Sequence, residues 1–155
     1  MSPTVRRAVA ESTADSEQIS AIIDEVLTEG VPVIFEGPMA PAEVRAWIER
    51  MGDGGAMFVV EDGGRVLAFA AIDPSEDDPT ECSLGSWVRL DQRRQGYATL
   101  LAEAALAFAR ERGYKGIRGR LPEGNQAALS YLSAIGAMVP LTNPGAHFEL
   151  PLEQE

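Results

Sequence analysis

Residues 88–99 read VRLDQRRQGYAT, the pattern of a strand that runs through a tight glycine turn into a helix. Its start is typical of the end of a strand, and a long helical pattern runs from Gly96 to Gly113. A strand that enters a helix through a glycine turn leaves several backbone N–H groups aimed at one point. The helix dipole adds positive charge there, so such a point binds phosphate. We predict a phosphate site at Gly96; the alternative is a strand-to-helix turn with nothing bound.

The elements around this turn predict a parallel strand pair. A strand at residues 81–90, the helix and a strand at Gly116–Leu121 follow one another, which is the order of a parallel crossover. A ligand is then expected at the carboxyl end of the first strand, where the helix begins.

The rest of the chain alternates helical and strand patterns without a repeat or a linker. A capping box at Asp15 and Gln18 opens the first helix, and Asp62-Gly63-Gly64 joins the two strands of a hairpin. The remaining elements that the patterns predict are a strand at Thr4–Val9, a first helix ending at Gly30, a second helix after Pro41, strands at Met57–Glu61 and Val66–Asp73, a helix at Asn125–Ile135, and strands at Ala137–Leu141 and His147–Leu150.

Composition limits the class of protein. The 155 residues are 45% hydrophobic and 24% charged, which predicts one globular domain over 1–155. Cys82 is the lone cysteine and His147 the lone histidine, so we expect no disulfide and no metal site; both residues are read as structural. The longest apolar run, Val66 to Ile72, is too short to span a membrane, and the N-terminus lacks a secretory signal. We therefore predict a cytoplasmic protein without membrane contact.

The charge distribution points to a small anionic ligand. The net charge is −11, and residues 1–80 hold 5 basic against 16 acidic side chains. All eight basic residues of the second half lie between Arg89 and Arg120. An acidic protein with one local positive region does not suit nucleic acid, but it does suit a small polyanion.

Two motifs together resemble the GNAT superfamily of acetyl-CoA-dependent N-acetyltransferases. Residues 93–98, RRQGYA, match the family signature Arg/Gln-x-x-Gly-x-Gly/Ala. Residues 125–136, NQAALSYLSAIG, resemble the second motif, with its asparagine, alanine and final glycine. The resemblance covers nearly the whole element order, although the N-terminal half is similar only in layout.

The resemblance implies a fold and a co-substrate. The fold is α/β, with a GNAT-like mixed, mostly antiparallel splayed sheet and helices on both faces. Residues 1–80 would form mainly the acceptor side and residues 81–136 the acetyl-CoA-binding core. Acetyl-CoA is the expected co-substrate, without a metal. The residues expected to hold it are Val88, Arg89, Leu90, Arg93, Arg94, Gln95, Gly96, Tyr97, Ala98, Thr99 and Asn125.

The resemblance also suggests proton-transfer groups, with alternatives. Many members carry a tyrosine acid on the penultimate helix, but Leu132 stands at the matching position and Tyr131 one residue earlier. Tyr131 is the candidate acid; it is otherwise a core or rim aromatic, and water, Tyr97 or Ser130 would then serve. Asn125 has a second reading as the N-cap of its helix.

The candidate base is Glu81. Relatives often carry a glutamate where this chain has Ser83, and strand alternation places Glu81 on the same face as Ser83. Glu81 is alternatively a solvated residue at the start of a strand. Cys82 lies on the opposite face and is predicted to be core, whereas Glu36 is a candidate for binding a cationic acceptor.

The sequence therefore predicts transfer of acetyl from acetyl-CoA to a primary amine by direct attack, with a small-molecule acceptor preferred to a protein or peptide amine. Two other hypotheses remain: a non-catalytic acyl-CoA-binding regulatory domain and a phosphate-binding module unrelated to coenzyme A. The apolar segment Ala137–Leu141 would allow a homodimer.

Overall fold

The strands of this chain form one mixed sheet. The computed structural model describes residues 3–28, 37–75, 78–92, 95–120 and 148–151. Within these residues six strands lie in the order β1-β2-β3-β4-β5-β6, and every neighbouring pair is antiparallel except β4 and β5. The strands are β1 (Thr4–Arg7), β2 (Ala56–Asp62), β3 (Arg65–Pro74), β4 (Glu81–Val88), β5 (Gly116–Arg120) and β6 (Phe148–Pro151). The predicted mixed, mostly antiparallel class and the parallel crossover are confirmed.

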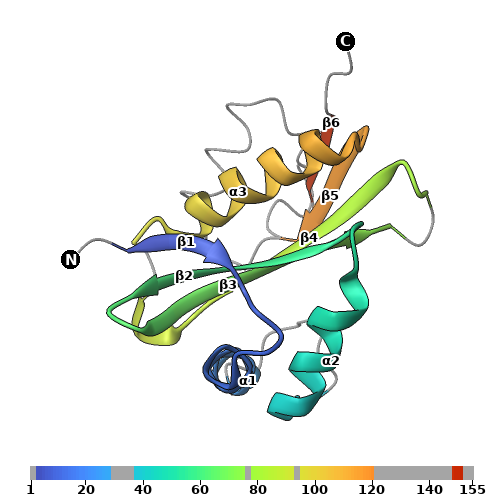
Figure 1. Cartoon of the computed structure of the whole chain (residues 1–155). Helices are drawn as coiled ribbons and strands as arrows, with labels where there is room; N and C mark the ends of the chain where they lie inside the picture. The colour runs from blue at the N-terminus through green and yellow to red at the C-terminus, as the bar shows by residue number, and fades with distance from the viewer. Residues whose placement is uncertain (1–2, 29–36, 76–77, 93–94, 121–147, 152–155) are drawn as a thin grey trace.

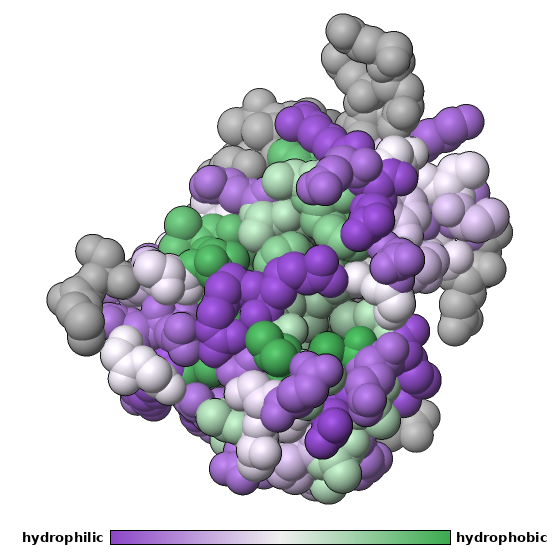
Figure 2. Space-filling model, viewed as in Figure 1, coloured by the Kyte–Doolittle hydropathy of each residue, from purple (hydrophilic) through white to green (hydrophobic). Residues whose placement is uncertain are grey.

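Helices cover both faces of the sheet, as predicted (Figure 1). The first face carries α1 (Thr13–Leu27) and α2 (Pro41–Met51), and the second carries α3 (Tyr97–Arg112). Alternation along the strands supplies a separate core to each face: Phe69 and Trp87 pack with α1 and α2, whereas Ile72, Cys82 and Leu84 pack with α3. In Figure 2 apolar side chains show along α3 and between α3 and the sheet.

The β2–β3 hairpin has the tight turn that its sequence predicts. Asp62 pairs with Arg65, so the turn itself is Gly63-Gly64. Both glycines have positive φ, 59° and 84°, which a two-residue hairpin turn of the primed type requires. In the next pair, β3 with β4, Phe69 lies opposite Trp87 and Asp73 lies opposite Ser83.

The predicted capping box of the first helix is wrong. Ser12 is the N-cap, and its Oγ accepts a hydrogen bond from the Asp15 N–H at 3.2 Å. Asp15 instead accepts from the Arg6 guanidinium and from the Val9 N–H, while Gln18 bonds the backbone of Gly64 and Val66. Long-range partners therefore take both side chains away from the local cap.

The parallel pair separates before β4 ends. The register of β4 against β5 runs from Glu81↔Gly116 to Gly85↔Arg120, while β4 itself continues to Val88. Residues 121–147 lie outside the described part of the chain, and with them the predicted helix at Asn125–Ile135 and the predicted strand at Ala137–Leu141. Cys82 is fully buried, and burial raises the pKa of its thiol to about 12, so its assignment to the core is confirmed.

Candidate active site

The N-terminus of α3 differs from those of α1 and α2. Ser12 caps α1, and the Glu43 carboxylate accepts from the Ala40 N–H at 3.1 Å at the start of α2. The first turn of α3 has no acidic residue, and Gly96 as its N-cap offers no side chain. Within the described residues no side chain accepts from the N–H groups of this first turn, which leaves their donors and the positive end of the helix dipole for an anion.

Gly96 is required by its backbone and leaves room for a ligand. Its φ is +82°, a left-handed conformation that glycine adopts without steric cost. A Cβ added there would meet no described atom within 4 Å. Gly96, Tyr97, Ala98 and Thr99 therefore lie where the phosphate turn was predicted, around an open helix terminus.

The end of β4 is held in place by α1. Arg89 is buried; its Nη1 donates to Glu25 Oε2 at 2.6 Å and its Nε to the Val66 carbonyl at 2.6 Å. The other Glu25 oxygen accepts from the Leu90 N–H at 3.0 Å. The side chain of Arg89 is thus engaged in fixing the strand end, and a direct contact of Arg89 with acetyl-CoA stays a prediction.

The face of β4 that is turned toward α1 and α2 carries an aromatic stack and, further from the strand end, an exposed residue. The indole of Trp87 packs directly over Gly85, and a Cβ on Gly85 would lie only 2.5 Å from a Trp87 ring carbon. Trp87 stacks on Phe69 at 4.9 Å between ring centroids, and Trp47 of α2 meets Phe69 edge-on at 6.4 Å. Ser83, the next residue of β4 on this face, is exposed. Phe69 and Trp87 are buried and only Trp47 is partly exposed, so Trp47 is the aromatic side chain of this stack that a ligand beside α2 could contact.

Glu81 has a cationic neighbour. Its Oε1 lies 3.0 Å from Arg118 Nη2 of β5, and the Glu81 side chain is mostly buried. Glu81 lies at the paired ends of β4 and β5, four residues before their register stops. Its assignment as a proton acceptor therefore stays a prediction.

The structure adds a carboxylate that the sequence reasoning missed. Asp73 lines a cavity of about 550 Å³ together with Trp47, Arg50, Pro74 and Ser75. The Trp47 indole N–H donates to Asp73 Oδ2 at 3.5 Å, and burial raises the pKa of Asp73 above its ordinary value. Alternation along β3 places Asp73 on the same face as Phe69, but its position beside Ser83 depends on the register of β3 against β4, which no local motif encodes.

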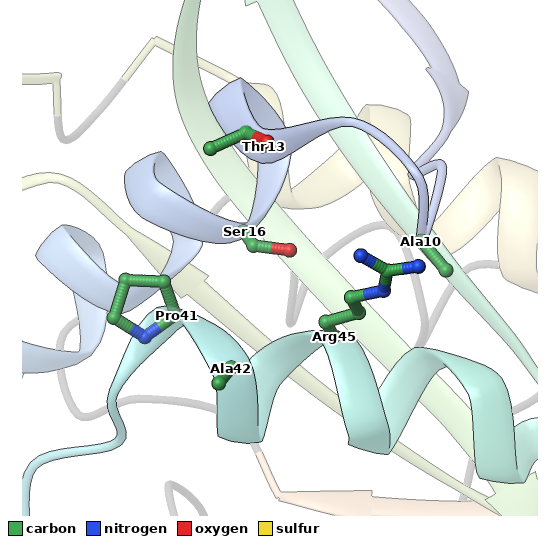
Figure 3. Close-up of a pocket in the computed structure, with 6 residues that line it drawn as sticks. All are labelled: Ala10, Thr13, Ser16, Pro41, Ala42 and Arg45. Atoms are coloured by element: carbon green, nitrogen blue, oxygen red, sulfur yellow. The ribbon is translucent and has the colours of Figure 1, made fainter.

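A second, smaller cavity lies apart from this one. It has a volume of about 190 Å³ and opens between the N-terminal turns of α1 and α2, where Ser16 and Arg45 point toward it (Figure 3). The far end of α1 is the one that contacts Arg89, so this cavity does not belong to the candidate site.

The other predicted site residues lie outside the described part of the chain. These are Glu36, Arg93, Arg94, Asn125 and Tyr131. Among the residues that the structure does describe, no three His, Cys, Asp or Glu side chains gather as metal ligands. None of the described helices is long and apolar enough to cross a membrane.

A parallel strand pair that separates beside an uncapped helix N-terminus defines a class of α/β proteins that bind a phosphorylated ligand at that point. The family model described as acetyltransferase (GNAT) family matches residues 21–136. The chain belongs to this family of acetyltransferases, as the resemblance predicted.

Solved structures share the fold. An N-acetyltransferase from Staphylococcus aureus Mu50 has a TM-score of 0.78 and 23% identity over 99% of this chain and 100% of its own. A phosphinothricin acetyltransferase from Sinorhizobium meliloti, solved with acetyl-CoA, has a TM-score of 0.79 and 20% identity over 98% of this chain and 89% of its own. A ribosomal-protein-alanine N-acetyltransferase from Brucella melitensis has a TM-score of 0.77 and 22% identity over 96% of this chain and 99% of its own. No curated protein sequence matches this chain.

Proposed function

We propose that this acyltransferase moves the acetyl group of acetyl-CoA to the primary amine of a small molecule. The observation that supports a small acceptor is the cavity of about 550 Å³ at Asp73, within the size range of small-molecule sites. Fold likeness does not decide the acceptor, because a phosphinothricin enzyme and a ribosomal-protein enzyme match equally well.

Acetyl-CoA supplies an activated thioester when bound. The first turn of α3 would hold its pyrophosphate through backbone N–H groups, since these donors have no side-chain acceptor in the described residues. The edge of β4 beyond Gly85 would hold the pantetheine arm, where the register with β5 has ended. The residues present therefore fit the co-substrate.

The transfer requires two proton movements. The amine nitrogen forms a bond to the acetyl carbon while the carbon–sulfur bond breaks, so the amine loses a proton and the departing thiolate gains one. The proton acceptor that we propose is Glu81, which lies on the same face of β4 as exposed Ser83. The proposed donor is Tyr131. Replacement by Gln or Phe, respectively, should lower kcat by about 100-fold if each group transfers a proton.

Release of free thiol tests the function. The protein is mixed with acetyl-CoA and a panel of small amines and N-terminal peptides, and the thiol is followed by absorbance. Turnover with small amines and not with peptides supports the proposal. Turnover restricted to peptides would replace the small acceptor by a protein amine, and acetyl-CoA binding without any turnover would indicate a regulatory domain.

A further inference from the structure

The cavity beside Asp73 combines three kinds of recognition group. Asp73 supplies a carboxylate, Arg50 in the last turn of α2 a guanidinium, and Trp47 an aromatic wall. Among the described residues neither Asp73 nor Arg50 has an ion-pair partner within 4.0 Å, although the field of Arg50 reaches Asp73. Both charges are therefore free to bind a ligand.

The Asp73 carboxylate packs against the backbone at Gly55. A Cβ on Gly55 would lie 3.0 Å from Asp73 Oδ1, so the absence of that Cβ lets the carboxylate pack against the chain that enters β2. Trp47 covers a second side with its indole N–H at 3.5 Å. The charged or titratable groups that the structure describes around this end of the sheet include Arg50, Tyr114, the ion pair of Glu81 with Arg118, and Arg7, which donates to the Gly55 carbonyl at 3.4 Å. An ammonium ion bound here would gain from a partly desolvated carboxylate and an aromatic face.

The cavity lies within reach of the place where β4 and β5 separate. Asp73 is opposite Ser83, and Gly85, where the register with β5 ends, is two residues further along β4. Strand geometry then puts Asp73 and Gly85 about 9 Å apart at their backbones. A ligand head group at Asp73 and Arg50 would therefore need a stem of roughly three or four methylene groups to bring a second amine to the cleft.

We infer that this cavity binds the zwitterionic head group of a diamino acid, and that the side-chain amine of the same molecule is the one acetylated. Asp73 holds the α-ammonium, Arg50 holds the α-carboxylate, and the aliphatic stem passes Trp47 and runs toward exposed Ser83 of β4. This inference rests on the proposed function, because it names the acceptor of that same reaction.

Three probes separate the two charges. L-Lysine carries the whole head group, 1,5-diaminopentane lacks the carboxylate, and 6-aminohexanoate lacks the α-amine. The variants are Asp73→Asn and Arg50→Gln, with Arg45→Gln as the matched control. Arg45 is an exposed arginine of the same helix that pairs with Glu49 at 3.6 Å and lies by the other cavity. The readout is KM and kcat for each probe, together with chromatographic identification of the acetylated nitrogen.

The expected pattern is specific to each charge. Asp73→Asn raises KM about tenfold or more for lysine and diaminopentane and leaves 6-aminohexanoate within about twofold, because only the first two place an ammonium there. Arg50→Gln raises KM about tenfold for lysine and 6-aminohexanoate and spares diaminopentane. Arg45→Gln changes none of them, and the product of lysine carries acetyl on its side-chain nitrogen.

Two outcomes overturn the inference without touching the proposed function. One is turnover of other small amines by the wild type with no turnover of the three probes. The other is an equal KM change, or none, for all three probes in both variants. Arg50 is exposed, so Arg50→Gln should fold normally and can be used for the test even if Asp73→Asn does not fold. Absence of thiol release with every amine and peptide is a different result, and it would refute the proposed function itself.

Discussion

A single arginine ties the N-terminal strand to α1 and to the hairpin. Arg6 donates to Asp15 at 2.7 and 2.8 Å and to Glu61 at 3.0 Å, and Asp15 also accepts from the Val9 N–H at 2.9 Å. The Asp15 side chain is only 2% exposed, whereas Glu61 is 28% exposed. The hydrogen bonds from Arg6 hold the pKa of Asp15 below its ordinary value. Asp15 should therefore contribute more than Glu61 to the free energy of unfolding that this network provides.

We predict that Asp15→Asn lowers the free energy of unfolding by about 2–4 kcal/mol, because it leaves the Arg6 guanidinium without its buried counter-charge. Glu61→Gln, the more exposed partner, should cost less than about 1 kcal/mol. Urea unfolding at pH 7 measures both. Equal losses for the two variants would contradict the assignment of the energy to Asp15.

The same network predicts a pH dependence. The folded-state pKa of Asp15 lies below the ordinary value of 3.8, so the unfolded state binds the proton first. The stability that Asp15 contributes is present above pH 3.8 and falls as the pH drops from there through the folded-state pKa. Urea midpoints measured at intervals of about one pH unit, from about pH 6 down to about pH 2, should converge for the wild type and Asp15→Asn at the acid end.

At the scale of elements, α1 fixes the segment that enters the phosphate turn. Glu25 near the end of α1 joins the buried Arg89 and the Leu90 N–H, and these residues lead directly into η1 (Leu90–Gln92) and then α3. Two parts of the chain that are far apart in sequence therefore depend on one carboxylate. Loss of that carboxylate leaves a buried guanidinium without its counter-charge.

We expect Glu25→Gln to lower the free energy of unfolding by about 2–3 kcal/mol and to weaken acetyl-CoA binding several-fold. Asp24→Asn is the control, since Asp24 is an exposed neighbour on the same helix. Denaturant unfolding and calorimetric titration measure the two effects. Wild-type stability in Glu25→Gln would show that α1 does not hold the strand end.

Local signals predicted most elements but few of their contacts. The Gly63-Gly64 turn, the helix after Gly96 and the position of Cys82 follow from periodicity and glycine placement, which are short-range properties. The first helix cap was misread because Ser12, and not Asp15, makes the local bond once Arg6 engages Asp15. Asp73 was missed because its place in the site depends on the register of β3 against β4, which the sequence of neither strand reveals.

At the scale of the whole molecule, a protein with net charge −11 must hold an anionic co-substrate by local geometry. The proposed phosphate site lies at the N-terminus of α3, where Gly96 turns the chain with a φ of +82°. The other end of the same helix offers a matched position: Gly113 has φ +79°, and a Cβ there also meets no described atom within 4 Å. Glutamate at either glycine introduces similar backbone strain, bulk and charge, but only one of them faces the proposed phosphate site.

Calorimetric titration of acetyl-CoA into the wild type, Gly96→Glu and Gly113→Glu tests whether the N-terminus of α3 binds the co-substrate. We expect a micromolar Kd for the wild type and about a 100-fold or larger increase in Gly96→Glu, because its carboxylate repels the pyrophosphate. For Gly113→Glu we expect a Kd within about threefold of the wild-type value, with circular dichroism showing all three proteins folded. Wild-type affinity in Gly96→Glu, or an equal loss in both variants, would contradict a co-substrate site at the N-terminus of α3.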